Sequence, residues 1–212
     1  MKTAVIGLGN IGKQVSLNLI AGGENIIVAD HTAGKAEAFA KASGGRAKAS
    51  TVPAAIEEAD VLVFAVYFDA IKQLLSEYGR KLIGKIVVDP SNPIAPDGKG
   101  GFKKIIAENQ SSGQILAGLI PAGAKLVKAF GTLAAASLGS GANRKPERAV
   151  LFYATDDKEA GLTVAKLIEK SGFAPVSVGG IDESIRIEVF GDLHELGKLG
   201  RLVSAKEAAS VV

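Results

Sequence analysis

Short apolar runs alternate along this chain with longer segments of helical periodicity. The runs are of strand length and continuously apolar, which is typical of strands that helices cover on both faces. They are Thr3–Gly7, Ile26–Ala29, Val61–Val66, Ile86–Asp89, Lys125–Phe130, Val150–Ala154 and Pro175–Val178, with a shorter run near Arg46–Lys48. The alternation predicts an α/β fold with a doubly wound, mostly parallel sheet.

Between the runs, apolar residues recur with the period of an α-helix. One predicted helix face carries Ile71, Leu74, Leu75 and Tyr78, and another carries Ala160, Val164, Leu167 and Ile168. Helix ends are marked as well. Pro53 fits the first turn of a helix and Gly172 fits a helix end, while Asp156 and Glu159 are predicted to be a cap and its return partner.

Two stretches interrupt this rhythm. Asp89–Gly98 and Gly139–Pro146 are rich in turn-forming residues and are predicted to be loops. After Ile181 the pattern predicts one or two helices, with a frayed end beyond Arg201. Strand patterns resume directly after both loops, so neither loop is expected to link two large domains.

A glycine-rich turn follows the first apolar run. The turn is Gly7-Leu8-Gly9-Asn10-Ile11-Gly12, and a helical pattern begins within it. Asp30 ends the second apolar run, near the spacing of about 20 residues that a dinucleotide-binding fingerprint has. The order of strand, turn, helix, strand and acid predicts an NAD(P)-binding Rossmann domain over residues 1–180, with residues 181–212 as a helical tail packed on it. The alternative is a glycine turn of purely structural importance.

Each glycine of this turn has a mechanical reason to be there. Gly7 permits the tight turn, Gly9 lets a pyrophosphate approach the backbone, and Gly12 lets the helix pack closely on the sheet. Unpaired N–H groups at the helix start then face the phosphates, and the helix dipole favours their charge. Because no cationic side chain precedes Lys13 in the turn, we expect backbone donors to provide most of the phosphate binding.

Composition excludes several other classes of protein. The 212 residues are 47% hydrophobic and 22% charged, which suits one compact domain with a small appendage. The net charge of +3 and the aromatic content of 5% argue against a nucleic-acid partner. The absence of Cys and the presence of only two histidines, His31 and His194, argue against a redox thiol or a metal site. No run approaches a membrane span or a signal peptide in length, so we expect a cytoplasmic protein without membrane contact.

Asp30 bears on the choice of nicotinamide cofactor. A carboxylate at this position accepts hydrogen bonds from an unphosphorylated ribose and repels a 2′-phosphate, which favours NAD slightly over NADP. His31 and Lys35 would offset that repulsion, His31 most strongly when protonated. The structural alternatives are that Asp30 caps the following helix and that His31 is a solvated loop residue.

Four segments together resemble the deazaflavin-dependent NADP oxidoreductase family, whose members pass hydride between NADP(H) and coenzyme F420. They are Val5–Gly12, Ala59–Val66, Lys85–Pro93 and Val127–Thr132. The last two are the more specific, and the tail segment His194–Gly197 also resembles the C-terminal end of that family. The resemblance covers about residues 1–200 and implies NADP as the cofactor.

The chain departs from the family pattern in two places. The family often has Asn where Gly131 stands, so any hydrogen bond from that side chain is lost here. NADP-selective members have a small polar residue and then Arg where this chain has Asp30 and His31, although Lys35 is kept. These departures leave the choice between NAD and NADP open.

Further ligand contacts are expected at the carboxyl ends of the strands, where open α/β sheets bind their ligands. Besides the turn, Asp30, His31 and Lys35, the predicted cofactor-binding residues are Val66, Tyr67, Ser91, Asn92, Phe130 and Thr132. Ser91, Asn92 and Thr132 are expected to flank the nicotinamide or the acceptor. In the structural alternatives, Ser91 and Asn92 only form a turn, and Tyr67 and Phe68 cap the core.

Other polar residues are interpreted as structural. We expect Lys128 to be a surface charge at a strand end rather than a proton donor, and Asp60 to end a helix–strand turn. Arg186 and Glu188 are predicted to form an ion pair on the tail helix, with contact to an acidic acceptor as the alternative, and His194 is predicted to be structural. No catalytic residue and no metal ligand is therefore predicted.

The resemblance implies an oxidoreductase that transfers hydride between a nicotinamide dinucleotide and a second redox cofactor such as a deazaflavin or a flavin. Holding two flat rings at hydride distance requires no side-chain acid or base. A ketone or imine reductase needs a proton donor and, in related proteins, a helical domain for which few residues remain here. A non-catalytic NAD(P)-binding sensor is the other alternative. The expected partners are small redox cofactors, with a homodimer that buries the apolar tail left open.

Overall fold

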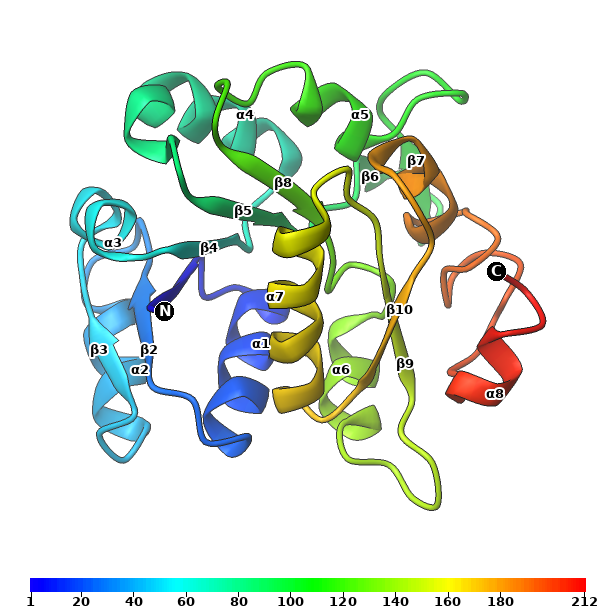
Figure 1. The fold of residues 1–212 in the computed structure, drawn as a ribbon, viewed down its shortest axis with the longest axis horizontal. Coiled ribbons are helices and arrows are strands. Elements are labelled where there is room, and N and C mark those ends of the chain that lie inside the picture. Colours follow the sequence, from blue (N-terminus) through cyan, green and yellow to red (C-terminus); the bar gives the residue numbers. More distant parts are fainter.

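The computed structural model describes residues 1–212 and contains a six-stranded parallel sheet (Figure 1). Its order is β3-β2-β1-β4-β5-β8. The strands are β1 (Thr3–Ile6), β2 (Ile26–Ala29), β3 (Ala47–Ala49), β4 (Val61–Phe64), β5 (Ile86–Asp89) and β8 (Lys125–Lys128). The order reverses at β1, as in a Rossmann fold, so the predicted fold class is confirmed.

The register of this sheet brings the carboxyl ends of its strands close to one line. Ile6 at the end of β1 pairs with Ala29 on one side and with Phe64 on the other. Asp89 at the end of β5 pairs with Lys128 at the end of β8. The glycine-rich turn and the loops after β4, β5 and β8 therefore leave the sheet along a single edge, where ligands of such sheets bind.

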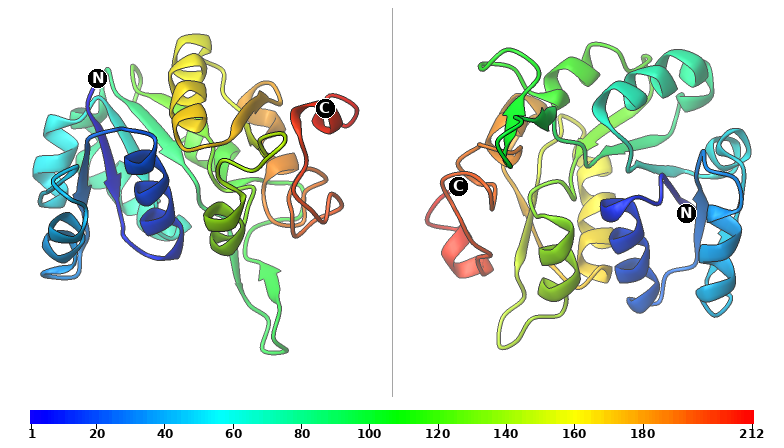
Figure 2. Two further views of the ribbon diagram at one scale, coloured as in Figure 1. Left: turned by 90° about the horizontal axis from the view of Figure 1, so that it is seen from below. Right: turned by 180° about the vertical axis from the view of Figure 1, so that it is seen from behind.

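Helices cover both faces of the sheet, as Figures 1 and 2 show. They are α1 (Asn10–Ala21), α2 (Lys35–Ala42), α3 (Val52–Glu58), α4 (Phe68–Tyr78), α5 (Ser112–Ala117), α6 (Ala135–Gly141) and α7 (Lys158–Lys170), with the 3-10 helix η1 (Gly79–Leu82) after α4. Helices α1, α2, α6 and α7 contribute to one apolar cluster, and α3, α4 and α5 to another. Successive strand residues alternate between the clusters, which explains the continuous apolar runs. Burial of each Val, Leu or Ile side chain stabilises the fold by about 1.5–3 kcal/mol relative to leaving it exposed. None of the helices combines the length and apolarity that a membrane crossing needs.

The last two predicted strands form a sheet of their own. β9 (Val150–Tyr153) and β10 (Ala174–Ser177) pair in parallel, with α7 as the crossover between them. An isolated antiparallel bridge between Lys128 and Ala154 joins this small sheet to the end of β8. The main sheet therefore ends at β8, and β9 runs beside its edge in the opposite direction.

The predicted loop Asp89–Gly98 is wrong in its second half, which contains a strand. β6 (Ile94–Pro96) pairs antiparallel with β7 (Phe102–Lys104). Asp97 Oδ1 accepts hydrogen bonds from the N–H groups of Lys99 and Gly101, which closes the hairpin loop. Of the turn-forming residues that the sequence shows here, Asp97 and Gly98 belong to this hairpin loop, and those of segment 90–93 form the connection from β5 to β6. The hairpin projects from the body of the molecule (Figure 2).

The predicted helix ends are largely confirmed, with one shift. Pro53 lies in the first turn of α3, and Gly172, at φ +91°, follows the end of α7. The cap of α7 is Asp157, which accepts the Ala160 N–H at 2.8 Å. Asp156 instead accepts the N–H of Ile181 at 2.9 Å. The predicted cap at Asp156 is therefore wrong, because the tail takes up that carboxylate and the helix begins one residue later.

The tail consists of the 3-10 helix η2 (Ile181–Ile187), a series of turns, and the short helix α8 (Ala205–Ala208). The prediction of a frayed end after Arg201 is wrong. Ser204 caps α8 in a capping box and forms an isolated bridge to the residue before β9. Helix α8 thus packs against β10, and Ala208 is fully buried.

Candidate functional site

The glycine-rich turn connects β1 to α1 in a geometry that only glycine allows. Gly7 has a φ of +93°, a region that L-residues rarely adopt, and a Cβ there would lie 2.4 Å from the Ala65 carbonyl oxygen. A Cβ on Gly12 would lie 1.9 Å from the Gly7 carbonyl oxygen. A Cβ on Gly9 would meet no atom within 4 Å. The close packing of the turn therefore requires glycine at positions 7 and 12, whereas Gly9 leaves open space above the backbone.

Helix α1 begins with free backbone donors. Its N-cap is Gly9, no side chain bonds to its first turn, and that turn contains no acidic residue. Thr51 and Asp157, by contrast, cap α3 and α7 with their side chains. Because the N–H groups of the first turn have no partner inside the helix, they are available to an anion, whose charge the helix dipole favours. The turn and this helix start fit the diphosphate of a dinucleotide.

Asp30 is bonded to the glycine-rich turn. Its Oδ2 accepts the N–H of Leu8 at 2.7 Å and lies 3.2 Å from Lys35 Nζ, while Oδ1 accepts the N–H of Thr32 at 2.9 Å. Burial alone would raise the pKa of Asp30, but these donors outweigh it and lower the pKa below its ordinary value. The carboxylate is therefore ionised at neutral pH. It does not cap α2, whose N-cap is Gly34.

The side chains of His31 and Lys35 flank Asp30. His31 Nδ1 lies 3.5 Å from Asp30 Oδ1, and the His31 side chain is 88% exposed. The Lys35 side chain is 40% exposed. Both groups thus reach solvent while they contact a carboxylate that is itself almost completely covered. The arrangement places a covered carboxylate, whose charge Lys35 partly offsets, beside two solvent-exposed side chains at the end of β2.

The residues between β4 and α4 divide into two kinds. Val66 packs on the turn, since its Cγ1 would lie 2.6 Å from a Cβ on Gly7. Tyr67 is 88% exposed, so the alternative that it caps the core is wrong. Phe68 is buried, with Lys72 Nζ 4.8 Å from the centre of its ring, and it does cap the core. Val66 thus lies against the turn, and Tyr67 is open to solvent.

Two hydroxyl groups beyond β5 and β8 are buried without a hydrogen-bond partner. Ser91 is 7% exposed and Thr132 is 1% exposed, and neither Ser91 Oγ nor Thr132 Oγ1 is bonded. Leaving a buried polar group unpaired costs about 1–3 kcal/mol. Buried polar groups normally have a partner, which for these two would be an ordered water or a ligand.

Asn92 joins the loops that follow β5 and β8. Its Nδ2 donates to the Gly131 carbonyl at 3.0 Å, and its Oδ1 accepts the N–H of Val189 at 2.7 Å. A Cβ on Gly131 would lie 2.7 Å from the Pro90 carbonyl oxygen, so the absence of a side chain at 131 lets the two loops approach. Asn92 therefore does more than form a turn, because it ties three segments together.

Phe130 is present at this edge through its backbone. Its side chain is fully buried in the core, and its φ is +64°. A left-handed conformation costs a residue with a Cβ about 1–2 kcal/mol. The backbone at the end of β8 is thus turned sharply, so that Gly131 lies against the loop after β5 while the Phe130 ring is buried in the core.

Lys128 is not the surface charge that the sequence analysis expected, since it is 1% exposed. Its Nζ lies 2.8 Å from Asp89 Oδ2 and 3.3 Å from Glu188 Oε1. It also donates to Ser112 Oγ at 2.6 Å and to the Ser91 carbonyl. Burial alone would lower the pKa of Lys128, but Asp89 and then Glu188 outweigh it and raise the pKa. We call these five residues the buried cluster.

The predicted ion pair between Arg186 and Glu188 is wrong. Arg186 Nη2 bonds to Asp192 Oδ2 at 2.9 Å, and the Arg186 Nε lies 3.2 Å from the same oxygen. Glu188 is 2% exposed and accepts the N–H groups of Ser112 and Gly113. The chain leaves η2 between these two residues, so that one side chain faces solvent and the other enters the buried cluster.

His194 is buried and neutral, in agreement with its predicted structural role. Its Nδ1 accepts the N–H of Leu196 at 2.8 Å, so its Nε2 carries the proton and donates to the Gly131 carbonyl at 3.0 Å. Burial lowers the pKa of His194 to about 4, against the bond to Gly131 and together with the charge of Lys128. Both ring nitrogens are therefore occupied at neutral pH.

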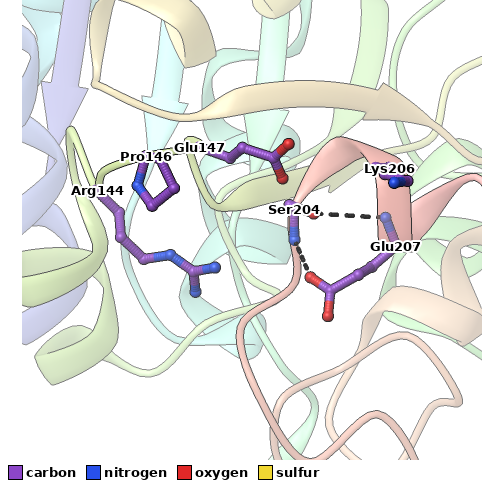
Figure 3. Close-up of a pocket in the computed structure, with 6 residues that line it drawn as sticks. All are labelled: Arg144, Pro146, Glu147, Ser204, Lys206 and Glu207. Atoms are coloured by element: carbon purple, nitrogen blue, oxygen red, sulfur yellow. Dashed lines mark hydrogen bonds between the residues drawn. The ribbon is translucent and has the colours of Figure 1, made fainter.

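A surface cavity of about 500 Å³ lies in another part of the molecule (Figure 3). It is lined by Arg144, Pro146, Glu147, Ser204, Lys206 and Glu207. Its lining includes no predicted site residue, and the dashed bonds in Figure 3 are the capping box of α8. The structure also brings together no group of three His, Asp or Glu residues that could hold a metal ion. Neither feature adds to the site around the glycine-rich turn.

The geometry first defines a class. A glycine-rich turn at the reversal point of a parallel sheet, with an acid at the end of β2, is that of a dinucleotide-binding Rossmann protein. The family model of NADP oxidoreductases that depend on coenzyme F420 matches residues 2–93. A hypothetical protein of Sinorhizobium meliloti is 30% identical to this chain over 96% of this chain and 95% of its own, with a TM-score of 0.84. The chain belongs to this family of NADP oxidoreductases.

More distant structures share the fold. A protein of Arthrobacter sp. FB24, proposed to be an F420-dependent NADP-reductase, is 22% identical over 87% of each chain, with a TM-score of 0.73. A reductive aminase of Aspergillus terreus in complex with NADPH is 20% identical over 85% of this chain, with a TM-score of 0.62. The match covers 55% of the aminase, so this chain spans about half its length.

Sequence reasoning missed the buried cluster, although one signal for it was present. Asp89 ends one apolar run and Lys128 lies within another. Both runs were predicted to be covered on both faces, which leaves a charged side chain there no route to solvent. The partner Glu188 carries no such signal, because it lies on a tail whose path only the folded chain defines.

Proposed function

We propose that this protein transfers hydride between a nicotinamide dinucleotide and a second planar redox cofactor, a deazaflavin or a flavin. The observation that carries the proposal is a dinucleotide-binding turn beside buried ionisable groups that all have internal partners. These groups, Lys128, Asp89, Glu188 and His194, form what we call the site floor. The non-catalytic sensor remains the second candidate, since the same floor would also serve a protein that only binds.

The residues that would hold the dinucleotide follow the edge of the sheet. The free N–H groups from Gly9 to Gly12 would bind the diphosphate, and Asp30, His31 and Lys35 would surround the adenosine ribose. Val66 and Tyr67 would line its middle. Ser91, Asn92 and Thr132 would flank the nicotinamide, which supplies the hydride when it is bound.

The state of the ionisable groups supports transfer between two cofactors over reduction of a ketone or imine. A ketone or imine reductase needs a proton donor beside its substrate. Here Lys128 is enclosed by two carboxylates, which raise its pKa. Both ring nitrogens of His194 are occupied by hydrogen bonds to the backbone. Hydride transfer between two rings depends on proximity and orientation, which rigid loops supply without a side-chain acid.

The direct test is oxidation of NADH and NADPH by the purified protein, followed by the loss of nicotinamide absorbance with FMN, a deazaflavin, a ketone or an imine as acceptor. We expect loss of absorbance with the deazaflavin or with FMN, and none above background with the ketone or imine. The Gly9→Val variant is the matched control, because it blocks the phosphate position without a steric clash. Dinucleotide binding without oxidation by any acceptor would support the sensor instead.

We further propose that Asp30 shifts the preference toward NAD. Its lowered pKa keeps it ionised, and only part of its charge is offset by Lys35 at 3.2 Å. A 2′-phosphate would meet this charge, whereas a ribose diol would donate to it.

Asp30→Asn keeps the size of the side chain, removes its charge and loses one of the two backbone hydrogen bonds that the carboxylate accepts. We expect NADP to bind about 5- to 10-fold more tightly to the variant, as for the loss of a repulsion of about 1 kcal/mol, and NAD to bind no more tightly. Dissociation constants from NADH and NADPH fluorescence titrations check this. Lys35→Met is the matched control and should weaken NADP binding. An unchanged ratio of the two constants in Asp30→Asn would contradict the proposed influence of Asp30.

A further inference from the structure

The tail segment 188–195 lies against the loops that form the proposed nicotinamide site. Val189 donates its N–H to Asn92 Oδ1 at 2.7 Å, and His194 Nε2 donates to the Gly131 carbonyl at 3.0 Å. The N–H of the next residue, Glu195, donates to the backbone of the loop after β8. Both ends of the segment are therefore held at the edge of the sheet, and the residues between them have a defined place beside that edge.

Phe190 occupies the middle of this segment in an unusual conformation. The N–H of Gly191 donates to the Glu188 carbonyl at 2.8 Å, which closes a turn with Phe190 at its third position. The φ of Phe190 is +76°, as a type II turn requires, and glycine is the residue that favours this position. A Cβ on Gly191 would lie 2.3 Å from the Arg186 carbonyl oxygen, so the chain next to Phe190 is closely packed. A phenylalanine is thus present where the backbone favours glycine.

The disfavoured backbone conformation of Phe190 is not offset by full burial of its side chain. It is 50% exposed, whereas its neighbours Val189 and Leu193 are 8% and 1% exposed. An aromatic ring that is held in a disfavoured backbone conformation and left half open to solvent is typical of a ligand contact. The rigid attachment of the segment means that little ordering remains to be done when a ring packs on it.

The nearby unpaired hydroxyls point to the same kind of ligand. Ser91 Oγ and Thr132 Oγ1 are buried and unbonded on the two loops to which the tail segment is tied. A flat heteroaromatic ring system presents apolar faces to an aromatic side chain and carbonyl and N–H groups at its rim to hydroxyls. The site offers both complements within one short stretch of the sheet edge.

We propose that Phe190 is a contact residue for the second redox cofactor, and that the tail segment 188–195 forms one wall of its site. This inference rests on the function proposed above, because it assigns the tricyclic ring of a deazaflavin or flavin to this wall and the dinucleotide to the glycine-rich turn.

The test compares Phe190→Gly, Phe190→Tyr and the control Leu162→Ala, which removes an apolar side chain of similar exposure, 47%, from α7. Glycine suits the turn, so Phe190→Gly should melt at the wild-type temperature or above. With saturating NADPH or NADH, we expect the dissociation constants of FMN and of a 5-deazaflavin, from their fluorescence, to rise about 10-fold in Phe190→Gly. Phe190→Tyr and Leu162→Ala should resemble the wild type, and the affinity for the dinucleotide should not change in any variant.

The outcomes separate this inference from the proposed reaction. If the wild type reduces the deazaflavin or FMN and Phe190→Gly binds it as tightly, the inference is overturned and the reaction stands. If the wild type binds the ring in a Phe190-dependent manner without oxidising the dinucleotide, the inference stands and the reaction is overturned. A wild type that binds neither ring overturns both. Greater loss of FMN than of deazaflavin affinity, or the reverse, identifies which ring the wall fits.

Discussion

Gly9 and Gly12 show how one residue type serves two purposes within a single turn. At Gly12 the backbone of Gly7 occupies the space of a side chain, whereas the space at Gly9 is open. Gly9 has ordinary backbone angles, φ −68° and ψ −165°, so the fold itself does not require a glycine there. The open space is explained by a ligand that needs close approach to the main chain.

The first prediction follows from this contrast. Gly9→Val should leave the free energy of unfolding within about 1 kcal/mol of the wild type and weaken dinucleotide binding more than about 10-fold. Gly12→Val should lower the free energy of unfolding by about 3 kcal/mol or more, because its Cβ would overlap backbone. Urea unfolding and NADH fluorescence titrations measure both quantities. Equal losses of stability in the two variants would contradict the assignment.

At the scale of elements, the carboxyl ends of β5 and β8 are joined to the tail by the buried cluster. Asp89 and Lys128 are register partners at the ends of their strands, and Glu188 arrives from the end of η2. The single cation faces two carboxylates, all at most 2% exposed. Such a cluster contributes little net stability, but removing one partner leaves buried charge without compensation. Its effect is to hold the Ser91 carbonyl, and with it the loop that carries the proposed nicotinamide contacts.

The second prediction concerns this cluster. Lys128→Met should lower the free energy of unfolding by about 3–5 kcal/mol, because it leaves Asp89 and Glu188 buried without a cation. Glu188→Gln should lower the free energy of unfolding by less, since Lys128 keeps its ion pair with Asp89. The double variant should be less destabilised than the sum of the two single variants, because one of the uncompensated charges is then gone. Urea unfolding of the four proteins forms the cycle, and strict additivity would show that the cluster does not act as a unit.

At the scale of the whole molecule, the tail is held to the body by polar contacts that depend on a neutral histidine. His194 accepts a backbone N–H with Nδ1, and a proton at Nδ1 would set two donors against each other. The folded protein holds the pKa of His194 at about 4, below the 6.5 of an exposed histidine. The unfolded chain therefore binds more protons than the folded chain between these two values.

The third prediction is a loss of stability in acid that depends on His194. The contribution of the neutral imidazole is fully present above about pH 6.5, and it decreases as the pH falls toward about 4, by up to about 3 kcal/mol. Carboxylates titrate in the same range, so the difference between the wild type and His194→Gln isolates the histidine. The free energy of unfolding, measured with urea between these pH values, should change more steeply with pH for the wild type than for His194→Gln. Parallel curves for the two proteins would mean that the pKa of His194 is not lowered by folding.

The sequence by itself determined the order of strands and helices, the parallel Rossmann sheet, and the glycine-rich turn with its acid. These features depend on local properties, namely the period of apolar residues and the space around a glycine. The hairpin of β6 and β7, the cap at Asp157 and the ordered end of the tail were missed or misplaced, because each depends on which distant segment takes up a polar group.

Only the tertiary structure decided what the site floor consists of. The burial of Lys128 requires β5 and β8 to be neighbours, and its second carboxylate requires the tail to return across their ends. The unpaired hydroxyls of Ser91 and Thr132 and the exposed ring of Phe190 are likewise defined by what surrounds them. Burial and the pairing of charges are properties of the packed chain, because they arise from residues that are far apart in sequence and adjacent in space.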